Sequence, residues 1–139
     1  MKKLLFLSLF ALASVVLSTR AQAQAIVIAN PSVKAADVSK SDLKEVFTGA
    51  STSLGGGHVI PVLLKEGSVN DEFLTTYISK TDSAFRASWR NLVFSGQATM
   101  PKSLDSDAAV VEYVVHNPGA IGYIGKTSPH DGVKVLAVK

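Results

Sequence analysis

One stretch of the sequence has the residue types and the order that could bind an anion. Lys65-Glu66-Gly67-Ser68-Val69-Asn70 follows an apolar run and leads directly into a predicted helix. The first backbone N–H groups of a helix have no partner within it, and with the Ser68 hydroxyl they can hold an anion at the positive end of the helix dipole. We therefore predict ligand contacts from Gly67, Ser68, Val69 and Asn70. Simple N-capping by the Ser68 side chain is the structural alternative.

Two more polar residues follow the first apolar run, Ala25–Ala29. Asn30 comes directly after this run and Ser32 two residues later. In open α/β sheets, ligands gather outside the carboxyl ends of strands. Asn30 and Ser32 are therefore further candidates for the same ligand site, on the condition that both strand ends lie at one edge of the sheet.

The sequence contains no arrangement typical of a catalytic or metal site. His58, His116 and His130 do not pair at metal-binding spacing, and no H-E-x-x-H run occurs. With no cysteine, a thiol nucleophile, a thiolate zinc site and an iron–sulfur cluster are all excluded. A G-x-S-x-G turn is missing, and no G-K-[ST] follows Gly55-Gly56-Gly57. We expect a protein that is not an enzyme and binds no metal and no cofactor.

Apolar runs and helix-capping residues alternate along the chain. The expected strands are 25–29, 59–64, 121–124 and 133–138, and the expected helices begin at Ser39, at Ser68, at Thr81 or Asp82, and at Ser106. The first run is apolar throughout, which is typical of a strand buried on both faces, as in a parallel sheet under helices. Pro61 cannot donate to a strand ladder, which indicates an edge position or a bulge. This alternation predicts an α/β layer fold.

Three of the expected helices have an apolar face at helical spacing. These faces are Leu43, Val46 and Phe47 in the first helix; Phe73, Leu74, Tyr77 and Ile78 in the second; and Phe85, Trp89, Leu92 and Val93 in the third. Such a stripe faces the core. Gly49 and Gly96 are expected to end the first and third helices.

Four segments, in this order, carry a resemblance to a known family. They are Ser41 to Gly49, Gly67-Ser68 with Phe73 five residues after the serine, Trp89 followed by Phe94-Ser95-Gly96, and Asn117-Pro118-Gly119-Ala120-Ile121-Gly122-Tyr123-Ile124. Together they resemble the periplasmic substrate-binding proteins of phosphate ABC transporters, over nearly all of residues 24–139. The resemblance implies a type 2 periplasmic-binding-protein fold, present here as a single lobe with a mixed sheet flanked by helices. It also implies capture of phosphate or a related oxyanion.

The chain departs from this family at the anion-binding motif. Where the family has R-x-D-x-S-G-T, this sequence has Leu64 for the arginine, Glu66 for the aspartate, Val69 for the glycine and Asn70 for the threonine. Lys65 is a cation next to the missing arginine, but it lacks the planar guanidinium fork. These changes argue for weaker or different ligand binding.

The resemblance also implies partners and leaves alternatives open. Full-length family members close two lobes over the ligand and serve a membrane transporter, whereas this chain has room for one lobe. An alternative is a lobe that has lost its ligand and acts as an interaction or sensory partner of a membrane protein. A homodimer with two lobes facing each other would rebuild a cleft.

The first residues have the pattern of an export signal. Lys2 and Lys3 precede an apolar run from Leu4 to Leu17, and Ala21-Gln22-Ala23 is an A-x-A cleavage pattern. This run of 14 residues is shorter than the roughly 20 that a membrane-spanning helix needs. We predict a signal peptide at 1–23 and a periplasmic domain at 24–139. An uncleaved N-terminal anchor is the alternative.

Composition and charge exclude other classes of protein. The chain has 139 residues, of which 47% are hydrophobic and 18% charged, which is typical of one globular domain. Its formal net charge of +3 comes from the predicted signal. Cleavage would remove three basic residues and leave 11 of the 14 lysines and arginines, equal to the 11 acidic residues. A neutral domain has no basic stripe for nucleic acid.

Overall fold

The computed structural model describes residues 24–139, so the predicted signal peptide at 1–23 lies outside the described residues. The strands are β1 (Ala25–Ala29), β2 (Asp37–Val38), β3 (Ser53–Leu54), β4 (Gly57–His58), β5 (Ile60–Leu64), β6 (Lys102–Leu104), β7 (Ala120–Gly125) and β8 (Lys134–Val138). The helices are α1 (Lys40–Thr48), α2 (Ser68–Phe73), α3 (Asp82–Phe94) and α4 (Asp107–His116). Helix α2 continues directly into a π-helical turn, η1 (Leu74–Ile78).

Six strands form one mixed sheet in the order β2-β8-β1-β7-β5-β6, and β3 pairs with β4 in a separate hairpin. Strand β1 runs antiparallel to both of its neighbours, β7 and β8, whereas the other neighbouring pairs are parallel. The carboxyl ends of β5, β6, β7 and β8 therefore lie at one edge of the sheet, and β1 ends at the opposite edge. This confirms the predicted mixed sheet flanked by helices.

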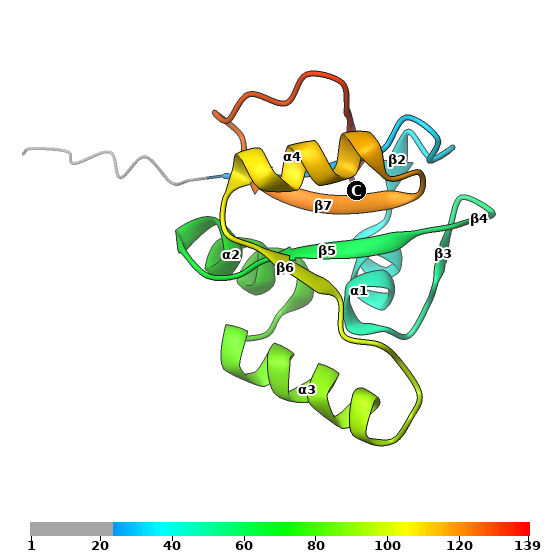
Figure 1. Ribbon diagram of the computed structural model, residues 1–139, viewed down its shortest axis with the longest axis vertical. Helices are drawn as coiled ribbons and strands as arrows, with labels where there is room; N and C mark the ends of the chain where they lie inside the picture. The colour runs from blue at the N-terminus through cyan, green and yellow to red at the C-terminus, as the bar shows by residue number, and fades with distance from the viewer. Residues whose placement is uncertain (1–23) are drawn as a thin grey trace, which may run out of the picture.

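Helices cover both faces of the sheet (Figure 1). Helix α4 packs on one face, where Val110 and Val114 approach the Cα of Gly122. Helices α1 and α2 pack on the other face, where Phe47 and Phe73 contact the ring of Tyr123. This double cover explains why β1 is apolar throughout. The predicted burial of β1 on both faces is correct, but its antiparallel pairing differs from the parallel sheet that such a run suggests.

The predicted helix starts are confirmed by their caps. The hydroxyls of Ser39, Thr81 and Ser106 accept hydrogen bonds from backbone N–H groups three residues further on, at 3.0, 3.2 and 3.1 Å. Helix α1 ends as predicted at Gly49, whose φ of 82° is in the left-handed region that glycine favours. Capping residues in the sequence therefore predict the starts of three of the four helices correctly.

Helix α3 packs against the end of α1 through Trp89 and Leu92. Phe85 and Trp89 are buried, and the Trp89 indole N–H donates to the Phe47 carbonyl at 2.9 Å, which confirms Trp89 as a core residue. Val93 was predicted to be buried but is 41% exposed. Leu92, in the last turn of α3, still approaches Gly49 at the end of α1, whereas Val93 does not reach the core.

Pro61 lies in β5, which is an internal strand rather than an edge strand. At Ile60 and Pro61, β5 pairs only with β7, because its pairing with β6 begins at Val62. The Ile60 N–H donates to the Gly119 carbonyl on the β7 side, so the nitrogen of Pro61 faces the side where no strand is paired. The proline thus occupies a local opening of the sheet, as its missing N–H requires.

Gly122 is expected to tolerate no side chain, because β7 lies directly beneath α4. A Cβ at this position would lie 2.9 Å from Val110 Cγ1 and 3.0 Å from Val62 Cγ2, both in buried β-branched side chains. We expect Gly122→Ala to lower the free energy of unfolding by about 1–3 kcal/mol, measured by urea denaturation. Gly57→Ala, whose Cβ would meet only one backbone oxygen at 3.9 Å, is the matched control. Equal stabilities of the two variants would contradict this account of the packing.

Candidate functional site

The candidate site lies at the sheet edge where β5 ends and α2 begins. Gly67, with a φ of 111°, precedes the helix and makes no side-chain cap. Ser68 is the first residue of α2, is exposed, and its hydroxyl makes no hydrogen bond to residues 24–139. The alternative of simple N-capping by the Ser68 side chain is therefore wrong. The hydroxyl is available to a ligand.

The first N–H groups of α2 are also free. The first backbone bond of the helix runs from the Asp71 N–H to the Gly67 carbonyl at 3.0 Å. The N–H groups of Ser68, Val69 and Asn70 have no acceptor within the described chain. Ser68 is exposed, Val69 half-buried and Asn70 fully buried. Two backbone donors and one hydroxyl are thus presented at the surface of this edge.

The side chain of Asn70 is buried, and both its nitrogen and its oxygen are hydrogen-bonded within the protein. Its amide donates to Asp82 Oδ1 at 2.8 Å, and its carbonyl oxygen accepts from the Tyr123 hydroxyl at 2.5 Å. The Tyr123 oxygen in turn accepts from the Leu64 N–H at 3.1 Å. Burial raises the pKa of Tyr123 well above its ordinary value, so the phenol keeps the proton that it donates to Asn70. Asn70 therefore fastens α2 to the sheet, and its side chain is fully buried.

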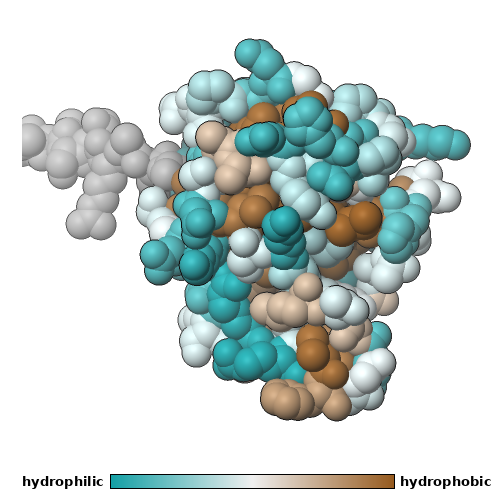
Figure 2. Space-filling view, viewed as in Figure 1, coloured by the Kyte–Doolittle hydropathy of each residue, from teal (hydrophilic) through white to brown (hydrophobic). Residues whose placement is uncertain are grey.

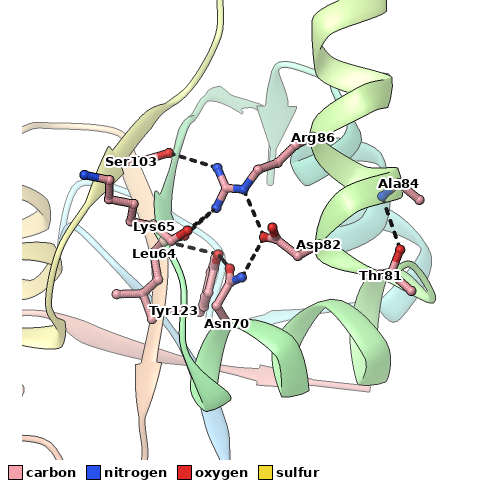
Figure 3. A network of polar contacts seen from close by, with 9 residues as sticks. All are labelled: Leu64, Lys65, Asn70, Thr81, Asp82, Ala84, Arg86, Ser103 and Tyr123. Carbon is pink, nitrogen blue, oxygen red and sulfur yellow. Dashed lines mark hydrogen bonds and ion pairs between the residues drawn. The ribbon is translucent and has the colours of Figure 1, made fainter.

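Arg86, on α3, completes the same network (Figure 3). Its Nε donates to Asp82 Oδ1 at 2.9 Å, and its Nη2 donates to the carbonyls of Leu64 and Lys65, each at 2.9 Å. Its Nη1 reaches the Ser103 hydroxyl at 3.3 Å. Because guanidinium donors lie in one plane, a single side chain can join α3, β6 and the end of β5.

Asn30 and Ser32 do not belong to this edge. Strand β1 runs antiparallel to β7, so Asn30 pairs its N–H with Ala120 at the start of β7 rather than at its end. The Asn30 amide donates to the carbonyls of Val114 and Val115 at 2.8 and 3.1 Å, and Ser32 Oγ accepts from the Gly119 N–H at 2.9 Å. Both side chains hold the end of α4 and the turn that follows it.

Charged groups near the candidate edge are mostly acidic or paired. Lys65 lies 3.5 Å from Asp105 in an exposed ion pair. Asp107 accepts from the Gly125 N–H at 3.0 Å and from the Ser128 hydroxyl at 2.5 Å, next to the same strand ends. The surface around the start of α2, at the left of Figure 2, is mainly hydrophilic. An anion bound here relies on hydrogen-bond donors more than on net positive charge.

An apolar pocket of about 560 Å³ lies elsewhere, near the start of β5. Its lining includes Ile60, Trp89, Met100 and Tyr113, and none of the predicted site residues. Its place between α1, α3 and β5 separates it from the free donors at Ser68 and Val69.

The sequence pattern did not identify Arg86, Asp82 and Tyr123 as part of the site. The interactions of Asn70 reach 12 residues along the chain to Asp82 and 53 residues to Tyr123. No local spacing signals a contact at such separations. Tyr123 lies in a segment that carries the family resemblance, and this was the one available hint.

Comparison with known proteins supports the fold. No protein-family model and no curated protein matches the sequence. Solved structures do match the chain. One is a phosphate ABC transporter substrate-binding protein with bound phosphate from Clostridium perfringens, with 20% sequence identity and a TM-score of 0.60. Two others are an ABC-type phosphate transport receptor from Vibrio cholerae, with 16% identity and a TM-score of 0.57, and PstS from Borrelia burgdorferi, with 23% identity and a TM-score of 0.58. These matches cover 83%, 83% and 84% of this chain but 44%, 46% and 47% of the respective structures.

The chain therefore has the fold of one part of the phosphate-binding proteins of ABC transporters, and it spans less than half the length of these three. The resemblance predicted from four short segments is confirmed at the level of fold. These neighbours are described as transport proteins rather than enzymes. Within residues 24–139, no helix is long and apolar enough to cross a membrane, and no three potential metal ligands cluster.

Proposed function

We propose that this protein is an exported solute-binding lobe that binds phosphate or a related oxyanion through the start of α2. The observation that carries the proposal is the set of unpaired donors at Ser68 and Val69, at the carboxyl end of β5. Ligands of open α/β sheets collect at such edges. The shared fold with proteins described as phosphate-binding supports the choice of ligand class.

The contacts in this proposal come from few residues. The Ser68 hydroxyl and the N–H groups of Ser68 and Val69 would donate to the anion. Gly67 leaves the approach open, since a Cβ there would meet no atom within 4 Å. Asn70 would orient helix α2. Asn30 and Ser32 would hold the end of α4 at the opposite edge of the sheet, away from the anion. The lobe would be exported after cleavage at residue 23 and would serve a membrane transporter.

Phosphate binding predicts a stabilised fold. We expect saturating phosphate to raise the unfolding temperature of residues 24–139, at constant ionic strength. A ligand at about a hundred times its dissociation constant adds roughly 2.7 kcal/mol, or about 10 °C for a domain of this size. Sodium chloride is the control for general salt effects, and sulfate tests whether another oxyanion binds. If no oxyanion shifts the transition, the proposal is wrong and the lobe is better explained as an interaction partner of a membrane protein.

A further inference from the structure

The peptide group of Leu64, at the end of β5, has no ladder partner on the β7 side of the sheet, although β5 still pairs with β6 at this residue. Pairing between β5 and β7 is confined to Ile60 and Pro61, so the strands no longer share a ladder at Leu64. The hydroxyl of Tyr123 accepts the Leu64 N–H, and Arg86 donates to the Leu64 carbonyl. Two side chains thus replace the missing strand partners at the residue from which the site loop departs.

These contacts form a closed ring of hydrogen bonds. The ring passes from the Leu64 N–H through Tyr123, Asn70, Asp82 and Arg86 and returns to the Leu64 carbonyl. It links the end of β5 to the third residue of α2, so it fixes the relative position of the strand end and the helix start (Figure 3). Among residues 24–139, every buried side-chain polar atom has a partner.

Arg86 also determines which backbone groups the loop presents. The carbonyls of Leu64 and Lys65 lie where the loop leaves β5, and an anion would be repelled by either oxygen. Both oxygens accept from Nη2 of Arg86. Because they are held by the guanidinium, the loop can turn its N–H groups rather than its carbonyls to the ligand. Four of the five N–H groups of Arg86 are used within the protein.

We infer that Arg86 is a positioning residue for anion binding: it holds the carbonyls of Leu64 and Lys65 away from the ligand and locks the donors at Ser68 and Val69 in place. This inference rests on the proposed function. The guanidinium acts through the loop, since its side chain is only 18% exposed and its donors are occupied by Asp82, Ser103 and the two carbonyls.

Arg86→Lys tests this role, because lysine keeps the charge but its compact ammonium cannot bridge two carbonyls and Asp82 at once. We expect the dissociation constant for inorganic phosphate, measured by titration calorimetry, to rise about tenfold. Val110→Ala is the matched control, since it removes buried volume on the opposite face of the sheet. This control should bind phosphate within twofold of the unsubstituted protein.

Equal affinity of Arg86→Lys and the unsubstituted protein would overturn the inference, and so would an equal loss in Val110→Ala. If the unsubstituted protein does not bind phosphate, the proposed function fails, and amide hydrogen exchange then tests separately whether Arg86 holds the loop. The Leu64 and Asp71 N–H groups are hydrogen-bonded on either side of the loop. Arg86→Lys should speed their exchange at least tenfold more than Val110→Ala does. If amide exchange became faster to the same extent across the whole sheet in both variants, Arg86 would contribute only to overall stability and would not position the loop.

Discussion

Ser68→Pro is expected to weaken phosphate binding by roughly 100-fold while the protein remains folded. Proline at this position removes both the hydroxyl and the N–H, and each hydrogen bond to a charged group contributes about 1.5–3 kcal/mol. Ser68 is the first residue of α2, where proline is favoured and the N–H has no partner in the helix. The ψ of Gly67 is 175°, outside the helical region that a following proline disfavours, so the residue before the proline is also compatible.

Ser68→Ala separates the two donors. It keeps the N–H and removes only the hydroxyl, so we expect a loss of about tenfold, intermediate between the unsubstituted protein and Ser68→Pro. Affinities would be measured by titration calorimetry, and urea unfolding would show that both variants retain their stability. Phosphate affinity that is unchanged in Ser68→Pro would place the ligand elsewhere.

Phe73→Ala is expected to cost about 4 kcal/mol of unfolding free energy. Phe73 is fully buried, stacks on Tyr123 with ring centroids 3.9 Å apart and meets Phe47 edge-on at 5.0 Å. Its removal leaves a cavity between α2, α1 and the sheet, and the aromatic contacts are lost with the buried area. The cost would be measured by urea denaturation with linear extrapolation.

Phe94→Ala provides the same change of side chain in a different environment. Phe94 is 87% exposed at the end of α3, so we expect its truncation to change stability by less than about 0.5 kcal/mol. A Phe73→Ala loss as small as that of Phe94→Ala would show that the aromatic cluster beneath α2 does not hold the helix on the sheet.

Local sequence signals were sufficient for most of the fold. A hydroxyl residue before an apolar stripe placed the starts of α1, α3 and α4, because a capping hydrogen bond depends only on residues three positions apart. The same reasoning treated Ser68 as a possible cap, but the structure makes Gly67 the residue before the helix. A glycine with positive φ can occupy that position without any side-chain bond.

Contacts between segments that are far apart in the sequence could not be predicted from such local signals. An apolar run such as Ala25–Ala29 shows burial on both faces but carries no information on strand direction. The antiparallel placement of β1 then puts Asn30 at the edge opposite to Ser68. Similarly, the stripe on α3 showed Phe85 and Trp89 as core residues but could not show that the core does not extend to Val93.

The polar network shows the same limit most clearly. Arg86 lies 22 residues from Leu64 and on the polar side of a helix, where a solvated surface arginine is the default expectation. Its role depends on α3 crossing the end of β5, which is a property of the tertiary fold. The family comparison could not supply this residue, because the anion motif of the resemblance lies at residues 64–70 instead.

Binding of an oxyanion at the start of α2 is tested most directly by the amide chemical shifts of its first residues. Phosphate would be titrated into ¹⁵N-labelled residues 24–139 at constant pH and ionic strength, with chloride as the reference salt. We predict saturable shifts that are largest at Gly67, Ser68 and Val69, with Gly119 at the opposite edge unchanged. Shifts that are absent, or that are as large at Gly119 as at Ser68, would contradict the claim.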